Sequence, residues 1–258
     1  MESILVCLKA VPTASQISIG TDQTLQREKL DLQWNIADQA ALEAALQLKH
    51  NGCTVTVLTM GPAKLAEPLR ELFGRGFDRA VLLTDPCLSG ADTYATAYAL
   101  SAAIQTLGNF DLILCGRRAV DGETGQVPPM LAAALDMPCI TNVESIENSD
   151  GALRLRRRLE SGSCNLCVTA PAVVTVCEYV YTLRLPSITA MRSAREKQVQ
   201  LLTVTELGLV PEACGLNGSL TKIIHLHKKF PGLRGGRKET DISSGVKKFL
   251  EICRGVDA

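Results

Sequence analysis

The sequence lacks an uninterrupted apolar run of about 18 residues or more, the length that a membrane-spanning helix needs. It also lacks a basic excess, because 27 Lys and Arg balance 27 Asp and Glu. Nucleic-acid-binding proteins usually carry such an excess, so the balance argues against that class. The opening MESILVCLKAVP has neither the basic start nor the cleavage site of a signal peptide. We therefore expect a cytoplasmic protein with no membrane span and no nucleic-acid partner.

The common catalytic signatures are missing as well. There is no G-x-S-x-G elbow, no H-E-x-x-H and no Walker A sequence, and we assign no catalytic residue. Of the three histidines, His50 closes a predicted helix, where a cation suits the helix dipole. His225 and His227 alternate in IIHLHKK, which places them on one face of a strand rather than in a metal site.

Cysteine is abundant but scattered, at positions 7, 53, 87, 115, 139, 164, 167, 177, 214 and 253. Several of these residues lie in apolar runs, which is typical of buried free thiols in a reducing compartment. Cys164 and Cys167 form a single C-x-x-C, without the second pair that a structural zinc site requires. On a strand, positions three apart face opposite sides, so we expect two unrelated thiols and no metal.

The 258 residues, 46% of them hydrophobic, suffice for an α/β domain with a buried core and an appendage. Short runs rich in Val, Ile and Leu predict buried strands at Ile4–Leu8, Thr54–Leu58, Ala80–Thr84 and Leu112–Cys115. Between them, helical spacing predicts helices at Ala37–His50, Leu65–Phe73, Asp92–Leu107 and Gln126–Leu135. This alternation predicts an α/β fold with a mostly parallel, Rossmann-like sheet.

From Gly151 onward the pattern changes to alternating apolar and basic residues, as in GALRLRRRLE. This change, followed by the apolar VTAPAVVTV, predicts an antiparallel excursion and a return to the sheet. The tail from Thr221 carries nine Lys and Arg against four Asp and Glu, with a short predicted helix at Ser244–Cys253. Such a tail cannot build a core of its own and is expected to lie on the domain or on a partner.

The loop after the fourth predicted strand, CGRRAVDGETGQVPP, has the features of a phosphate site. Ligands of open α/β sheets bind beyond the carboxyl ends of the strands, and helix N-termini attract phosphate. The glycines permit a close backbone approach, the arginines add positive charge and the polar residues add hydrogen-bonding groups. The candidate residues are Cys115, Gly116, Arg117, Arg118, Asp121, Gly122, Thr124, Gly125, Gln126 and Val127.

Three other loops at the same predicted edge also carry small or polar residues. They supply Asp92, Thr93 and Thr96 at the start of the third helix, Thr59 and Gly61 after the second strand, and Lys9, Ala10 and Val11 after the first. Asp92 and its neighbouring threonines also suit simple helix capping. Together the loops predict a bound nucleotide without specifying which one.

These loops resemble the beta subunit of electron transfer flavoproteins. The matching stretches are ILVCLKAVP, NIADQAALEAALQLK, TMGP, GADTYAT, CGRRAVDGETGQVPPMLA, PAVVTV, RLPSITAMRSAR and GLNGSLTK, in family order. The resemblance implies an adenine nucleotide α-hydrolase-like fold, a cofactor contact at Asn35, and a heterodimer with an alpha subunit. In the ordinary branch of the family the site holds structural AMP. In the electron-bifurcating branch it holds an FAD that accepts a hydride from NADH.

The loop spelling favours the bifurcating branch, and hence FAD over AMP. That branch reads approximately A-I-D-G-D-T-A-Q-V-G-P, and this chain reads AVDGETGQVPP. It departs from the pattern at Glu123, Gly125 and Pro128, and Pro128 removes a backbone N–H that a phosphate could use. Val127 in place of a hydroxyl leaves room for a pyrophosphate. NAD(H) would then be a transient electron donor.

The resemblance also predicts two partner-binding segments. Residues 184–197 match the loop that grips an acyl-CoA dehydrogenase-type flavoenzyme, with Ile188 as the apolar anchor. The contacting residues are expected to be Arg184, Leu185, Pro186, Ile188 and Met191, with Leu185 where an aromatic residue is more usual. We therefore divide the chain into a nucleotide-binding domain (1–200) and an arm that wraps the alpha subunit (201–258).

Four functions compete at this point. They are a bifurcating carrier subunit with FAD, a carrier subunit with structural AMP, a universal-stress-type nucleotide-binding module, and an independent nucleotide-using enzyme. The recognition segment and the arm weigh against the third. The lack of a P-loop-like glycine signature and of a catalytic base weighs against the fourth.

Overall fold

The computed structural model describes residues 1–13, 31–149, 152–169, 171–222 and 240–254. The chain divides into two compact units, Met1–Ile224 and His225–Ala258. The functional division at residue 200 remains a prediction, and so does the wrapping of a partner by the tail. The predicted strand with His225 and His227 lies outside the described residues.

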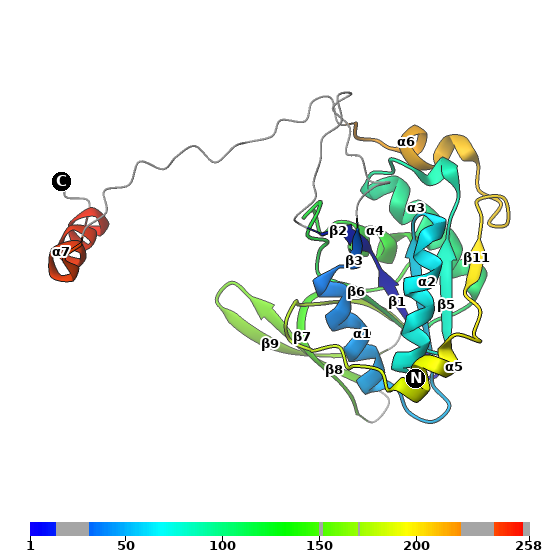
Figure 1. Ribbon diagram of the computed structural model, residues 1–258, viewed down its shortest axis with the longest axis horizontal. Coiled ribbons are helices and arrows are strands. Elements are labelled where there is room, and N and C mark those ends of the chain that lie inside the picture. Colours follow the sequence, from blue (N-terminus) through cyan, green and yellow to red (C-terminus); the bar gives the residue numbers. More distant parts are fainter. Residues whose placement is uncertain (14–30, 150–151, 170, 223–239, 255–258) are drawn as a thin grey trace. The chain divides into compact units, whose positions relative to one another are not determined.

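In the described part of the first unit, the central feature is a nine-stranded mixed sheet (Figure 1). In spatial order its strands are β11 (Gln200–Leu202), β5 (Arg79–Leu83), β4 (Thr54–Met60), β1 (Ser3–Leu8), β6 (Leu112–Gly116), β10 (Ala172–Val176), β7 (Cys139–Ser149), β8 (Ala152–Leu159) and β9 (Gly162–Val168). Neighbouring strands from β11 to β7 run parallel, whereas β8 pairs antiparallel with both β7 and β9. Two short strands, β2 (Ala10–Pro12) and β3 (Leu32–Trp34), form a separate antiparallel pair.

The helices of the first unit are α1 (Ile36–Leu48), α2 (Ala66–Arg70), α3 (Thr93–Leu107), α4 (Val127–Ala134), α5 (Ile188–Ala194) and α6 (Gly215–Gly218). They complete two hydrophobic cores, one on each face of the sheet. Ile4 and Val6 of β1 belong to the core that contains α1, whereas Leu5, between them, belongs to the core of α3 and α4. Alternate residues of a strand face opposite sides, so a strand covered on both faces must be apolar throughout.

The α/β prediction with a mostly parallel sheet is confirmed. All four predicted strands are present, and so are the antiparallel excursion and the return to the sheet through β10. Cys164 and Cys167 both lie on β9, as expected. The described residues contain no group of three or more His, Cys, Asp or Glu side chains that could hold a metal ion. No helix in the described ranges is long and apolar enough to cross a bilayer.

One predicted helix, Leu65–Phe73, is wrong in its extent. The segment is instead a 3-10 turn (η3, Ala63–Leu65), the short α2 and a second 3-10 turn (η4, Glu71–Arg75). Pro68 lacks an N–H, and Gly76 ends the segment in the left-handed conformation, with φ 109°. The apolar spacing therefore located a helical segment, but it did not reveal that only Ala66–Arg70 within it forms an α-helix.

The second unit contains α7 (Ile242–Cys253), close to the predicted Ser244–Cys253. Asp241 caps it by accepting a hydrogen bond from the Ser244 N–H at 2.7 Å. Its apolar side chains, at Ile242, Val246, Phe249, Leu250 and Ile252, are all exposed. The helix is therefore amphipathic and has no buried residue of its own.

We expect Leu114→Ala to lower the free energy of unfolding by about 2–5 kcal/mol, because its fully buried side chain would leave a cavity beside α1. Urea denaturation measures the change. Leu159→Ala is the matched control, because Leu159 is 42% exposed and its truncation should cost less than about 0.5 kcal/mol. Equal losses in the two variants would contradict this placement of the core.

Candidate functional site

The carboxyl ends of β1, β4, β6 and β10 meet at one rim of the sheet, and the loop that follows β6 crosses this rim. The backbone N–H of Arg117, the first loop residue, donates to the Val176 carbonyl at the end of β10 at 2.9 Å. The loop then runs to Gln126, where α4 begins. The sequence placed its strongest nucleotide candidates in this loop.

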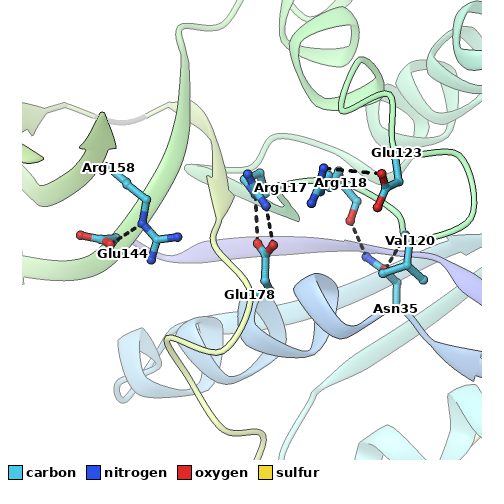
Figure 2. A network of polar contacts seen from close by, with 8 residues as sticks. All are labelled: Asn35, Arg117, Arg118, Val120, Glu123, Glu144, Arg158 and Glu178. Carbon is cyan, nitrogen blue, oxygen red and sulfur yellow. Dashed lines mark hydrogen bonds and ion pairs between the residues drawn. The ribbon is translucent and has the colours of Figure 1, made fainter. Parts of the chain in front are cut away.

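Asn35, at the start of α1, holds the loop in place. Its side-chain amide donates to the Arg118 carbonyl at 3.0 Å, and its carbonyl oxygen accepts from the Val120 N–H at 3.1 Å (Figure 2). Asn35 itself is completely buried. Both polar ends of the Asn35 amide therefore bind the loop backbone. Asn35, which was predicted to contact a cofactor, thus fixes the conformation of the loop.

Asp38, one turn further along α1, is a site residue that the sequence analysis missed. Its carboxylate accepts the Lys9 N–H at 2.8 Å and the Gly116 N–H at 3.1 Å, so it joins the ends of β1 and β6. Burial raises the pKa of this carboxyl to about 7, although the hydrogen bonds oppose the shift. The sequence signal that could have revealed Asp38 is a single acidic residue near the start of a helix that is rich in Ala and Leu.

Gly116 is required by this arrangement. A Cβ at position 116 would lie 2.2 Å from Asp38 Oδ1, which no real side chain tolerates. Gly125 has φ 62°, the left-handed region that glycine adopts without strain. Gly122 has open space where a Cβ would lie, so its predicted role, a close approach of the backbone to a ligand, remains a prediction.

Ion pairs fix the charged side chains of the loop. Lys9 Nζ lies 2.7 Å from Asp121 Oδ1, which ties the loop to the end of β1. Arg117 makes two bonds to Glu178, one from Nε to Oε2 at 2.9 Å, and these bonds hold the pKa of Glu178 below its usual value. The Arg118 guanidinium lies 3.8 Å from Glu123, a looser contact (Figure 2).

Two recesses flank the loop and share Arg118 and Glu123 as a common wall. The smaller, of about 160 Å³, is lined by Ile36, Ala37, Arg118, Val120, Glu123, Glu178 and Tyr179. The larger, of about 270 Å³, is lined by Arg117, Arg118, Glu123, Thr124, Gly125, Thr141, Asn142 and Thr175. The larger recess thus brings together predicted loop residues with polar side chains of β7 and β10 that the sequence analysis did not include.

Strained backbone conformations gather at these recesses. Among the described residues, four non-glycine positions have a positive φ, and three of them line a recess: Glu123 (52°), Asn142 (60°) and Tyr179 (66°). Left-handed backbone in a bulky residue costs free energy and persists only where the surroundings enforce it. Such strain is typical of ligand-binding regions.

The N-terminus of α3 adjoins the loop through a side-chain contact, because Thr93 Oγ1 donates to Gln126 Oε1 at 3.0 Å. Asp92 caps the helix by accepting from the Ala95 N–H at 3.0 Å, and it also accepts from the Thr221 N–H at 2.8 Å. The Asp92 carboxylate therefore acts as a helix cap, which was the alternative role considered for it. Thr96 lies within the first turn, and its N–H donates to the Asp92 carbonyl at 3.0 Å.

The start of α4 offers fewer backbone donors than expected. Val127 is its first residue, and the next two are Pro128 and Pro129, which have no N–H. A phosphate at this helix end must therefore rely on side chains more than on backbone amides. The Thr59 and Cys115 side chains are buried below the rim, as is Val11, whereas Gly61 accommodates Leu65, whose Cδ1 lies 2.5 Å from a Cβ built at position 61.

The predicted partner-binding segment has exposed apolar side chains, and contacts of Arg184 and Ser187 hold the segment in place. Arg184 Nη2 lies 2.7 Å from Oε1 of the buried Glu43, and Ser187 caps α5. Leu185 and Ile188 are 86% and 77% exposed, and Met191 is exposed to a smaller extent, at 39%. Pro186 lies between the two exposed residues. The anchor residue predicted at Ile188 is thus accessible, and Leu185 is even more so.

A Rossmann-like α/β sheet with a glycine-bearing polar loop over its carboxyl rim defines the class of this chain. The electron transfer flavoprotein domain model matches residues 23–207, more than half of the chain. The chain belongs to the electron transfer flavoprotein beta subunit family.

Three curated relatives illustrate the similarity. The chain is 38% identical over 236 residues to the caffeyl-CoA reductase-Etf complex subunit CarD of Acetobacterium woodii, covering 90% of this chain and 89% of the relative. It is 40% identical over 225 residues to the electron transfer flavoprotein subunit beta of Thermoanaerobacterium thermosaccharolyticum, with 86% of each covered. It is 39% identical over 231 residues to the protein FixA of Sinorhizobium fredii, covering 85% of this chain and 81% of the relative.

Asp38 should make stability depend on pH in a defined direction. Its pKa is raised from 3.8 to about 7 on folding, so the folded chain keeps a proton that the unfolded chain has lost. This contribution favours the folded state at acidic pH and is lost as pH rises through about 7. The parent should therefore lose about 2 kcal/mol relative to Asp38→Asn between about pH 5.5 and 8. Urea denaturation at both pH values tests this, and a constant difference would contradict it.

Proposed function

We propose that this chain is the beta subunit of a heterodimeric electron transfer flavoprotein that holds FAD at the rim of its sheet. It passes electrons between NAD(H) and an acyl-CoA dehydrogenase-type flavoenzyme by flavin-based electron bifurcation. The observation that carries the proposal is the loop from Cys115 to Val127, held over the parallel strand ends by Asn35 and Asp38. A bound FAD would supply the hydride and single-electron chemistry, and the chain would position it.

The two recesses support a two-part ligand. One recess is partly apolar and the other is polar, and they adjoin across the Arg118–Glu123 wall. A dinucleotide has several chemically distinct parts, whereas AMP has fewer and would need less of this surface. The family relative from Acetobacterium woodii bears the name of a reductase–flavoprotein complex, which agrees with a chain that acts inside a larger assembly. Structural AMP in a carrier without bifurcation is the alternative.

Two surfaces support partner binding. The segment Arg184–Arg195 presents Leu185 and Ile188 to solvent, and exposed aliphatic side chains beside basic residues suit an interaction hot spot. In the second unit, α7 exposes an apolar face that α7 itself cannot bury. We assign the first surface to the dehydrogenase and the second to the alpha subunit.

Cofactor content distinguishes the alternatives. The full chain is copurified with its larger subunit, and FAD and AMP are counted per heterodimer. Two FAD would support the proposal, one FAD with one AMP would support the carrier with structural AMP, and no flavin would refute both. We expect Gln126→Ala and Asp121→Ala to deplete the nucleotide of this chain severalfold, because they loosen the Thr93 and Lys9 contacts of the loop.

Gln105→Ala is the matched control, because Gln105 is an exposed glutamine near the C-terminal end of α3. Its nucleotide content should equal that of the parent, and the flavin of the alpha subunit should persist in all variants. Full nucleotide content in both loop variants would refute the assignment of the site.

Ile188→Ala should slow electron delivery to the dehydrogenase about tenfold or more, because a hot-spot truncation costs at least about 1.4 kcal/mol. Cofactor content should stay unchanged, because residue 188 does not line the rim. Stopped-flow reduction kinetics measure the rate, with Leu185→Ala as a second test and Val210→Ala, at another exposed apolar position, as the control. Parental kinetics in both segment variants would remove the partner role.

A further inference from the structure

Tyr179 is an exposed aromatic residue at the smaller recess. It is 80% exposed, and it lines the recess with Ile36 and Val120, which are 36% and 48% exposed. Large apolar side chains that gather at a concave surface commonly mark a ligand site. No role was assigned to Tyr179 from the sequence, and the nucleotide loop itself does not contain it.

The backbone of Tyr179 has an energetically unfavourable conformation, which fixes the position of its ring. Tyr179 has φ 66°, a conformation that bulky residues adopt rarely and at about 1–3 kcal/mol. The preceding residues enforce it, because the Cys177 N–H donates to the Val143 carbonyl at 2.9 Å and Glu178 is held twice by Arg117. The Tyr179 side chain is exposed and makes little contact within the chain, so contacts inside the chain do not offset the free energy of this strain. Contact between the ring and a bound ligand would offset it.

The chemistry of the smaller recess selects a planar ring rather than a phosphate. Its lining has two carboxylates, Glu123 and Glu178, against one guanidinium, Arg118, and Glu178 is already paired with Arg117. The recess therefore has no excess of positive charge that would favour an anion, and Glu123 can accept an N–H group. Ile36 and Val120 add apolar surface. The larger recess has Thr124, whose hydroxyl suits a phosphate better.

We propose that Tyr179 is a stacking residue whose ring packs on the planar heteroaromatic ring of the nucleotide bound at the rim. This inference rests on the proposed function, because it names which part of the nucleotide this recess takes. Two rings share the required chemistry, the adenine and the isoalloxazine of FAD, since both are flat and carry N–H donors. Stacking on an aromatic side chain contributes about 1–3 kcal/mol per base.

The test separates the ring from the backbone strain. Tyr179→Asn removes the ring but keeps a residue that tolerates the left-handed region, so the chain should fold. Tyr179→Phe keeps the ring and removes only the hydroxyl. Each full-length variant is titrated with FAD and with AMP, by flavin fluorescence and by calorimetry, and its thermal unfolding is recorded alongside.

We expect Tyr179→Asn to bind FAD about 5- to 100-fold more weakly and Tyr179→Phe to bind like the parent. An equal loss for AMP assigns the stack to adenine, whereas a loss for FAD alone assigns it to isoalloxazine. In the second case the quenching of bound flavin should also decrease in Tyr179→Asn, a change that a purely structural role would not produce.

Parental affinity of Tyr179→Asn for both ligands would overturn the inference while leaving the proposed function intact. The inference is also overturned if this variant loses only its association with the larger subunit, because Tyr179 would then be an interface residue. If the unsubstituted chain binds neither nucleotide, alone or with its larger subunit, the proposed function fails and the inference fails with it.

Discussion

The arrangement of the rim depends on one buried carboxylate. Asp38 accepts N–H groups from the ends of β1 and β6, and it reaches both because position 116 has no side chain. Burial penalises its charged form and the hydrogen bonds oppose this penalty only in part, so its pKa is raised to about 7. Asn35 acts from the same helix start and fixes the loop above. The first turn of α1 therefore sets the geometry of a loop that lies more than 80 positions later in the chain.

Charge at the rim is closely balanced. Arg117 is neutralised by Glu178 and Lys9 by Asp121, and a further pair joins Arg158 of β8 to Glu144 of β7 at 2.6 Å (Figure 2). Only the loose Arg118–Glu123 pair stands between the recesses. A ligand can therefore separate this pair at small cost, since exposed ion pairs contribute about 0–1 kcal/mol. The looser pair is suited to rearrange on binding.

The sequence predicted β1, β4, β5 and β6, because these strands are buried on both faces and read as apolar runs. It did not predict β7 and β11, whose residues are only partly buried. It also placed a loop with contiguous glycines and polar residues after β6, and the structure has this loop there. That the loop binds a nucleotide remains a prediction. The sequence analysis missed Asp38, Glu178 and Asn142, because their roles arise from contacts between distant segments that spacing cannot reveal. The segment Leu65–Phe73 is helical as predicted, but only Ala66–Arg70 is an α-helix, because apolar periodicity does not separate an α-helix from adjoining 3-10 turns. Helix capping at Asp92 was foreseen as an alternative, because the same residue types serve caps and ligands.

The two prolines at the start of α4 have a further consequence. Backbone amides are the same in every residue type except proline, so a site built from them resists change by substitution. Pro128 and Pro129 remove two amides at the start of α4, so a ligand at this helix end would have to be bound by side chains. Side chains differ between sequences, so chains of one family can differ at this rim while the sheet stays the same.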